Sequence, residues 1–251
     1  MLDLTGKTIL VTGADGGVGT GICRQLANFG ADVVVHTMDA TDKTRELVVA
    51  LKELGSDSEI VEGNICDPLN CQKIVSNVVE RYGRLDGLIN NAGVQPLVSF
   101  EEITPEQWSF VLEVNATGTH LMTKAAAMFM KDYGGSIVHI ASVEASTPAP
   151  NHIHYDVSKA GVKMHARAAA LELGKYCIRV NTVSPGLVNR GDIASEWPEG
   201  YQSWMRSVPI KRTAIPEDIG NACSFLMSDL AAFVSGHDLV VDGGMSAVQG
   251  W

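Results

Sequence analysis

The sequence is poor in basic residues and has no long apolar run, and each shortage excludes a class of function. It has 19 lysines and arginines against 29 aspartates and glutamates, a net charge of −10, whereas proteins that bind nucleic acid or anionic membranes need positive charge. No apolar run approaches the ~18 residues of a membrane helix. The first residues lack the basic and apolar segments of a signal peptide. We therefore expect a cytoplasmic protein with no nucleic-acid or membrane partner.

Cysteine is also scarce and irregularly spaced. The five cysteines are odd in number, and neither they nor the histidines show the spacing of a zinc-ligand set. We therefore predict no metal site. The cysteines lie in segments predicted as core or helix, which favours reduced thiols in a cytosolic protein. They are Cys23, Cys66, Cys71, Cys177 and Cys223.

Short apolar runs alternate with longer helical patterns along the whole chain. Runs that are almost entirely apolar and are separated by helices predict a parallel sheet covered on both faces. We expect one doubly wound, Rossmann-like α/β domain over 1–251, built on a seven-stranded sheet. The predicted strands are 7–11, 32–36, 59–62, 85–90, 136–141, 178–183 and 238–241. The predicted helices are 17–29, 42–54, 68–82, 105–131, 155–175 and 216–227.

One segment, 187–210, interrupts this alternation. It is rich in tryptophan, tyrosine, proline and glycine, and it is too long for an ordinary connection between a strand and a helix. Insertions of this kind are often lids or binding loops. We therefore predict an irregular substrate-binding loop at 187–210.

A glycine-rich turn follows the first predicted strand. The stretch TGADGGVG, at 12–19, lies between that strand and the first predicted helix. In this context glycines allow the backbone to approach a pyrophosphate, which then lies at the amino terminus of the helix. The spacing of Gly13, Gly17 and Gly19 is TGxxxGxG rather than the common GxGxxG. We predict a dinucleotide-binding turn.

Tyr155 and Lys159 lie four residues apart at the start of a predicted helix, so their side chains share one face. A tyrosine with its ordinary pKa near ~10 is a poor base at neutral pH. A nearby ammonium group favours the tyrosinate and is expected to lower that pKa. The pair therefore predicts acid–base chemistry on a substrate hydroxyl or carbonyl group. Asp156, which lies between them, is expected to point away from the site, although a carboxylate next to Tyr155 could oppose the ionisation of the phenol.

Further motifs follow in order along the chain. They are NNAG at 90–93, Asn115 within a helical pattern, Ser142 after the fifth strand, VSPG at 183–186 and VDGG at 241–244. With the glycine turn and the Tyr155–Lys159 pair, they resemble the compact branch of the short-chain dehydrogenase/reductase family over essentially the whole chain. This resemblance implies an NAD(P)-dependent oxidoreductase that interconverts a secondary alcohol and a ketone.

The resemblance also implies a role for individual residues. Tyr155 would be the general acid/base, and Ser142 would hydrogen-bond the reacting oxygen. Lys159 would bind the nicotinamide ribose, and Asn115 would hold a relay to solvent. The implied cofactor contacts are Gly13, Asp15, Gly17, Val18, Gly19, Thr37, Met38, Asn64, Ile65, Asn91, Ala92, Gly93, Tyr155, Lys159, Pro185, Gly186 and Val188.

The end of the second strand usually decides between NAD and NADP in this family. An acid in place of Thr37 would select NAD and an arginine in place of Met38 would select NADP, but the chain has neither. Asp15 lies next to a turn position where NADP-preferring relatives often carry a base, so NAD is favoured over NADP. Asn64 replaces an aspartate that binds the adenine amino group and can accept the same hydrogen bond. Arg190 replaces a threonine near the nicotinamide and could hold the pyrophosphate.

Positions that border the substrate in the family are mostly polar here. Glu144 and His152 could hydrogen-bond a polyhydroxylated molecule, and the pattern is similar to that of bacterial glucose dehydrogenases of the family. Trp197 could instead cover a hydrophobic ring, so a cyclic alcohol also stays open. The predicted substrate contacts are Gln95, Ser142, Glu144, His152, Tyr155, Asn189 and Trp197.

Two other functions stay open at this point. A 3-oxoacyl-carrier-protein or ketone reductase would use NADPH, but an acidic carrier protein does not suit a net charge of −10. A catalytically silent dinucleotide sensor would keep the glycine turn without needing Ser142, Tyr155 or Lys159. By resemblance, the chain is expected to form a homotetramer, with a dimer as the second possibility, in which the helices 105–131 and 155–175 pair across subunits.

Overall fold

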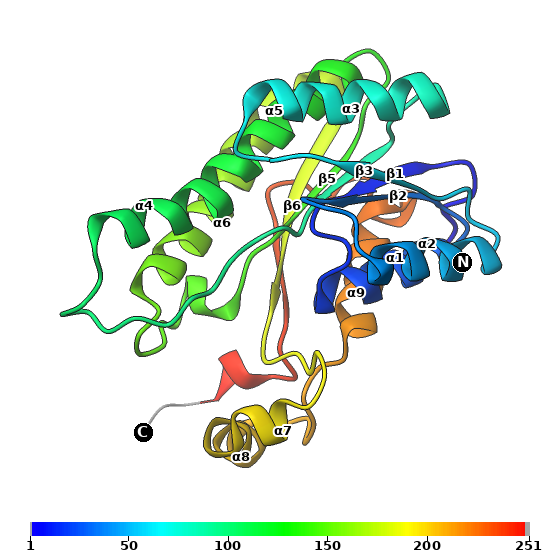
Figure 1. Cartoon of the computed structure of the whole chain (residues 1–251). Coiled ribbons are helices and arrows are strands. Elements are labelled where there is room, and N and C mark those ends of the chain that lie inside the picture. The colour runs from blue at the N-terminus through cyan, green and yellow to red at the C-terminus, as the bar shows by residue number, and fades with distance from the viewer. Residues whose placement is uncertain (1, 249–251) are drawn as a thin grey trace.

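Seven parallel strands form one sheet through the middle of the molecule (Figure 1). In this computed structural model, which describes residues 2–248, the strands lie in the order β3-β2-β1-β4-β5-β6-β7. β1 pairs in parallel with both β2 and β4. The strands are β1 (Thr8–Val11), β2 (Asp32–Thr37), β3 (Glu59–Glu62), β4 (Gly87–Asn90), β5 (Gly135–Ile140), β6 (Ile178–Pro185) and β7 (Asp238–Val241). The predicted doubly wound, Rossmann-like α/β fold is confirmed.

Helices cover both faces of the sheet and enclose one apolar core on each side (Figure 1). One face carries α1 (Gly17–Asn28), α2 (Asp42–Glu53) and α9 (Pro216–Met227), and the other carries α3 (Pro68–Tyr82), α5 (Thr119–Met130) and α6 (Ile153–Leu173). Because both faces are covered, β1 is buried at every position, as a parallel sheet requires. Among the described residues, none of the helices combines the length and apolarity required to cross a bilayer.

The predicted helix starts are accurate where the chain carries capping residues. The side chain of Asp67 accepts hydrogen bonds from the backbone N–H groups of Leu69 and Asn70 at the start of α3. Pro68 occupies the first helical position, where the missing N–H group removes no hydrogen bond. α9 likewise begins on a proline, Pro216. These signals are local, so the sequence is sufficient to predict them.

Two segments differ from the prediction. The predicted helix 105–131 is divided into α4 (Pro105–Leu112), a π-helical turn (Glu113–Gly118) and α5. A π turn holds one residue more than an α-helical turn, and the apolar periodicity does not reveal it. The segment 187–210 is not irregular, because it contains α7 (Ile193–Glu196) and α8 (Pro198–Ser207).

Candidate active site

The predicted site residues gather at the carboxyl ends of the parallel strands. The glycine turn follows β1, the NNAG motif begins at the end of β4, and Ser142 follows β5. β1 and β4 are neighbours in the sheet although they are far apart in the chain. Such a switch point opens a crevice in which doubly wound sheets bind ligands. The topology therefore brings residues from distant parts of the chain to one edge.

The glycine turn is packed so closely that side chains would not fit. Gly13 has a φ of +57°, and a Cβ atom on it would lie 2.8 Å from Cα of Ala92. A Cβ atom on Gly19 would lie 2.5 Å from the carbonyl oxygen of Gly13. The N-cap of α1, Gly16, offers no capping side chain, which leaves the first N–H groups of the helix for an anion. The turn therefore fits the pyrophosphate of a dinucleotide.

Side chains that follow directly after β1 and β4 hold this turn in place. Nδ2 of Asn91 donates to the carbonyl oxygens of Thr12 (3.0 Å) and Gly13 (2.8 Å). The hydroxyl oxygen of Thr12 accepts from the backbone N–H groups of Asn91 (3.0 Å) and Ala92 (3.1 Å). The NNAG motif thus fixes the backbone of the glycine turn as well as bordering the crevice.

His36, at the end of β2, also holds the turn, and the sequence analysis missed it. Its Nδ1 atom accepts from the N–H group of Gly13 (3.3 Å), so its Nε2 atom carries the proton and donates to the carbonyl oxygen of Gly63 (3.0 Å). Burial lowers the pKa of His36, although the bond to Gly63 opposes that shift. The ring is therefore neutral. A histidine within an apolar strand was the only signal in the sequence.

A carboxylate does lie at the end of β2, but it belongs to Asp15. The hydroxyl groups of Thr37 and Thr44 both donate to Oδ2 of Asp15, at 2.9 and 2.7 Å. Thr37 is only 5% exposed and its hydroxyl is engaged in this contact, whereas Met38 is 55% exposed. The glycine turn therefore supplies the acidic group that the end of β2 lacks.

The other predicted cofactor contacts differ in their hydrogen-bond partners and in their exposure. Oδ1 of Asn64 accepts from the backbone N–H group of Cys66 (2.9 Å), so the oxygen expected to bind the adenine amino group already has a partner. Arg190 lies against the glycine turn, since a Cβ atom on Gly17 would be 2.6 Å from Cβ of Arg190. Ile65, Pro185 and Val188 are buried, Val18, Ala92 and Gly186 are half-buried, and Gly93 is exposed.

The π-helical turn places Asn115 in the interior. Its Oδ1 atom accepts from the N–H group of Val94 (2.8 Å), and its Nδ2 atom donates to the carbonyl oxygen of Val94 (3.0 Å) and to Oγ of Ser158 (3.0 Å). A Cβ atom on Gly93 would lie 3.1 Å from Oδ1 of Asn115 and 3.5 Å from Nζ of Lys159. Asn115 and Lys159 therefore meet at the NNAG loop.

Tyr155 and Lys159 share one face of α6, with Nζ 5.6 Å from the centre of the phenol ring. Nζ donates to the carbonyl oxygen of Ile140 (2.7 Å), and burial lowers the pKa of Lys159 to about 8. Burial raises the pKa of Tyr155 to about 12; Glu144 adds to this rise, and a hydrogen bond to Ser142 opposes it. The expected lowering of the Tyr155 pKa is therefore wrong for the free protein, because burial of the phenol is the largest influence on it.

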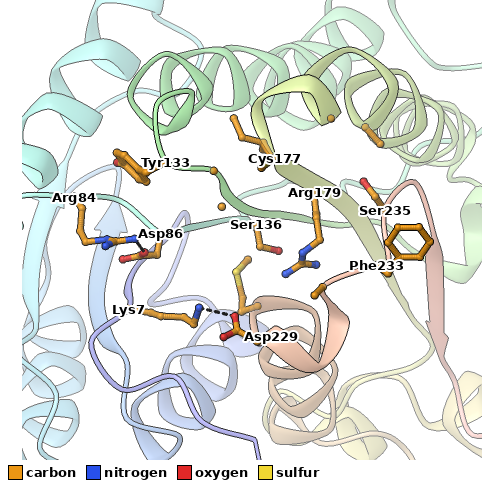
Figure 2. A pocket seen from close by; sticks show the side chains of 17 residues that line it. Lys7, Arg84, Asp86, Tyr133, Ser136, Cys177, Arg179, Asp229, Phe233 and Ser235 are labelled. Atoms are coloured by element: carbon orange, nitrogen blue, oxygen red, sulfur yellow. Dashed lines mark hydrogen bonds and ion pairs between the residues drawn. The ribbon is translucent and has the colours of Figure 1, made fainter.

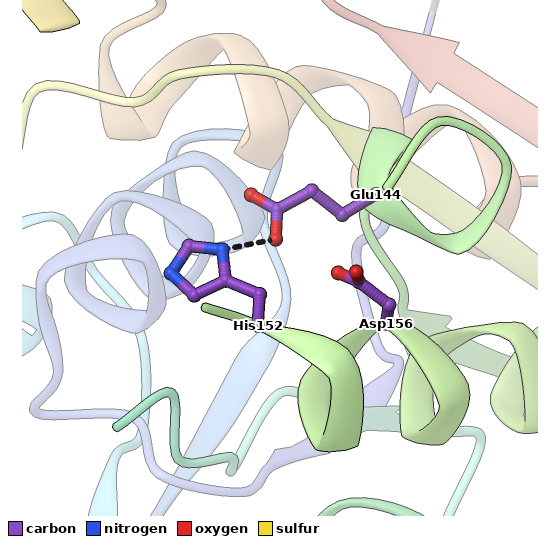
Figure 3. A group of neighbouring side chains, drawn as sticks. All are labelled: Glu144, His152 and Asp156. Atoms are coloured by element: carbon purple, nitrogen blue, oxygen red, sulfur yellow. Dashed lines mark hydrogen bonds and ion pairs between the residues drawn. The ribbon is translucent and has the colours of Figure 1, made fainter. Parts of the chain in front are cut away.

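Three titratable side chains meet beside Tyr155 (Figure 3). Nδ1 of His152 and Oε2 of Glu144 are 2.7 Å apart in a hydrogen bond that raises the pKa of His152. Asp156 points toward this pair, so the expectation that it points away is wrong. The reason is that the first turn of α6 packs against the short helix η2 (Val143–Ala145), which carries Glu144. Burial and the neighbouring Glu144 raise the pKa of Asp156 to about 6.

The remaining predicted substrate residues lie outside this cluster. Gln95 is exposed in the loop after the NNAG motif. Oδ1 of Asn189 accepts from the backbone N–H group of Gly191 (3.2 Å). Trp197 is 55% exposed, and its ring lies directly against Gly200. None of these three side chains belongs to the group of Glu144, His152 and Asp156.

A separate hollow of about 680 Å³ lies at the opposite edge of the sheet, where β5 and β6 begin (Figure 2). Four of its charged side chains form two ion pairs, Lys7 with Asp229 (2.9 Å) and Arg84 with Asp86, and Arg179 donates to the backbone carbonyl oxygen of Leu226. Cys177, the exposed residue just before β6, also lines it. None of the predicted site residues is among the described residues around this hollow.

Comparison with known proteins identifies the class of this chain. The family model described as Enoyl-(Acyl carrier protein) reductase matches residues 13–246. The chain is 36% identical to an L-rhamnose 1-dehydrogenase (NAD(P)(+)) of a Sphingomonas species, over 96% of this chain and 97% of that protein. It is 32% identical to glucose 1-dehydrogenase 2 of Bacillus subtilis, over 97% and 96% of the two chains.

A solved structure agrees with these relatives. A short-chain type dehydrogenase/reductase from Mycobacterium marinum superposes with a TM-score of 0.90 at 28% identity, over 98% of this chain and 97% of that one. The chain therefore belongs to the short-chain dehydrogenase/reductase family. It is an NAD(P)-dependent oxidoreductase that interconverts an alcohol and a ketone.

Proposed function

We propose that the chain is a sugar or polyol dehydrogenase that prefers NAD and uses Tyr155 as its general acid/base. The observation that carries this proposal is the meeting of Ser142, Tyr155 and Lys159 close to the glycine turn, with Glu144 and His152 beside them. A bound nicotinamide dinucleotide supplies the hydride exchange. Tyr155 removes the proton of the substrate hydroxyl while Ser142 orients the reacting oxygen.

The charges around Tyr155 determine whether its side chain is a neutral phenol or a tyrosinate. In the free protein its pKa of about 12 favours the neutral phenol, which can donate a proton to a carbonyl oxygen. The tyrosinate needed for oxidation of an alcohol requires positive charge nearby. Lys159 lies 5.6 Å from the ring, and the positive charge of Arg190 lowers the pKa of Tyr155. Both cations therefore support the base form.

The preference for NAD rests on Asp15. Its carboxylate lies at the carboxyl end of β2, held by Thr37 and Thr44. A carboxylate there can accept hydrogen bonds from the two ribose hydroxyls of NAD. The additional phosphate of NADP would meet a negative charge at the same place.

The proposed substrate class rests on side-chain chemistry and on the relatives. Glu144 and His152 offer acceptor and donor atoms suited to several hydroxyl groups, and two relatives are named for their action on rhamnose and glucose. The matching family model is described as an acyl-carrier-protein reductase, so an NADPH-dependent 3-oxoacyl or ketone reductase is the alternative. An acidic carrier protein would be repelled by a net charge of −10.

We propose that the enzyme is a cytoplasmic homotetramer in which 187–210 closes over the substrate. Met128 on α5 and Met164 and Leu171 on α6 are 61%, 60% and 85% exposed, which offers apolar surface to another subunit. All five cysteines are free, as suits a reducing compartment. Trp197 is exposed on the proposed lid.

The change Tyr155→Phe tests the proposed chemistry. It removes the hydroxyl group and keeps the ring, so we expect kcat on L-rhamnose, D-glucose or a polyol to fall ~10³-fold. The affinity for NADH, measured by fluorescence titration, should not change. If the variant keeps its turnover, Tyr155 is not the acid/base. Wild-type activity confined to 3-oxoacyl thioesters and NADPH would establish the alternative.

A further inference from the structure

The cluster of Glu144, His152 and Asp156 contains ligands that proton transfer by Tyr155 does not use. Each residue offers one ligand atom, and these atoms lie within 4.8 Å of one another. Figure 3 shows the side chains converging from η2 and from the start of α6. Within residues 2–248 it is the one group of three such side chains. Two carboxylates and one imidazole suit Zn²⁺ or Mn²⁺.

Asp156 supplies an independent observation that points to a bound ligand. Its side chain is directed into the cluster (Figure 3) and the residue is only 9% exposed. Its Oδ1 atom is buried and has no hydrogen-bond partner among the described residues. A buried carboxylate oxygen without a partner is strongly unfavourable, and a cation held by the cluster would give it one.

We propose that Glu144, His152 and Asp156 bind one divalent cation, of the Zn²⁺ or Mn²⁺ type, beside Tyr155. The 2.7 Å bond between Nδ1 of His152 and Oε2 of Glu144 then opens, and both atoms direct a lone pair at the ion. The side chains of His152 and Glu144 are 15% and 20% exposed, which gives the ion a path from solvent. Asp156 closes the inner side of the site.

Three protein ligands leave at least one coordination position open. Because the site adjoins Tyr155, that position would take water or a hydroxyl group of the substrate. This last point rests on the proposed function, since vicinal hydroxyls of a sugar or polyol are the groups that such an ion would hold. The binding of the ion itself does not depend on the substrate.

Titration of metal-free protein with Mn²⁺, followed by the electron paramagnetic resonance of the free ion, tests the site. We expect one saturable equivalent in the wild type. Asp156→Asn keeps the shape of the side chain and removes its charge, so its affinity should fall at least tenfold. The matched control is Asp42→Asn, which removes the same charge from the first turn of α2 and should leave binding unchanged. Glu144→Gln serves as a second variant if Asp156→Asn folds poorly.

Four results would overturn the proposal. They are the absence of saturable Mn²⁺ binding in the wild type, unchanged binding by Asp156→Asn, an equal loss in the Asp42→Asn control, and a loss of binding in His165→Gln. His120 and His165 form another imidazole pair, 3.2 Å apart, so a loss of binding in His165→Gln would place the ion elsewhere. Every variant is also titrated with NADH. Dinucleotide binding does not depend on the metal site, so this titration separates a failure of the metal proposal from a failure of the proposed function.

Discussion

At the residue scale, hydrogen bonds join the carboxylate of Asp15 to the hydroxyls of Thr37 and Thr44. The two hydroxyls fix Oδ2 of Asp15 at 2.9 and 2.7 Å. In the family pattern, the residue at position 37 determines the cofactor preference. In this chain the negative charge near that position belongs to Asp15 of the glycine turn. The carboxylate beside Thr37 therefore comes from a residue that lies 22 positions earlier in the sequence.

We expect Asp15→Ser to shift the affinity ratio toward NADPH by about tenfold, or ~1.4 kcal/mol. The change removes the negative charge and keeps a hydroxyl that can bond to Thr37. Titration with NADH and NADPH measures the ratio. Asp39→Ser removes an exposed charge two residues after the end of β2 and is the control. If Asp39→Ser shifts the ratio and Asp15→Ser does not, the role belongs to Asp39.

The buried position of Lys159 lowers the stability of the folded protein. Burial lowers its pKa to about 8 from 10.5 in an unfolded chain. Between these values the unfolded chain binds more protons than the folded one, so the contribution of Lys159 to stability increases as pH rises. Below pH 8 the buried ammonium destabilises the folded state fully.

We therefore expect Lys159→Met to increase the free energy of unfolding at neutral pH by about 2 kcal/mol, while it abolishes turnover. The gain should shrink as pH rises from 8 toward 10.5. Urea unfolding of both proteins across this range measures the difference. Lys52→Met, on the exposed surface of α2, should show no such difference. A destabilised Lys159→Met at neutral pH would contradict the argument.

At the residue scale, the sequence predicts the relative positions of residues that lie close together in the chain. The spacing of Tyr155 and Lys159 is enough to place both on one helix face. His36, Thr44 and Asp156 were missed or misjudged because their roles depend on contacts with other elements: the glycine turn, Asp15 and η2. The raised pKa of Tyr155 was also unpredictable, since burial is a property of the folded chain.

At the element scale, the π-helical turn between α4 and α5 decides where Asn115 lies. Its amide bonds to both backbone groups of Val94 and to Ser158. It therefore joins the NNAG loop to α6. Periodicity predicted a continuous helix here, because an apolar pattern does not record a single additional residue in one turn.

We expect Asn115→Ala to lower the free energy of unfolding by ~2 kcal/mol, because it leaves the N–H and carbonyl groups of Val94 without their partner. The NNAG loop would also lose its fixed position beside Lys159, so kcat should fall. Denaturant unfolding and steady-state kinetics measure the two effects. Asn28→Ala, at the exposed end of α1, should change neither. Unchanged stability in Asn115→Ala would show that the loop is held by other contacts.

The other elements show where sequence prediction succeeds. Helices that begin with a capping side chain or a proline, such as α3 and α9, were placed correctly. α7 and α8 were missed because they lie in a segment whose glycine, proline and aromatic content suggests irregular structure. Their helical state depends on packing, such as that of Trp197 on Gly200.

At the scale of the whole molecule, buried histidines make the fold sensitive to acid. Burial lowers the pKa of His139 to about 3 and also lowers that of His36. Below pH 6.5 these histidines bind a proton in the unfolded chain but stay neutral in the folded chain. Stability therefore falls as pH is lowered, by ~1.4 kcal/mol per pH unit for His139. Asp156, with a pKa of about 6, acts in the opposite direction below that value.

The variant His139→Gln isolates one of these contributions. Glutamine can accept from Asn90 and donate to His165, as the ring does. We expect the variant to lose less stability than the wild type as pH falls from 6.5 toward about 5. Urea unfolding at several pH values measures both slopes. Equal slopes would mean that His139 is protonated in the folded state.

The position of Cys177 has a practical consequence for the orientation of the enzyme on a solid support. It precedes β6 at the edge opposite the candidate active site, and it is exposed, whereas the other four cysteines are buried or half-buried. A maleimide-coated surface would couple at this thiol. The attachment point would then lie away from the candidate active site of the coupled subunit, without any engineered cysteine.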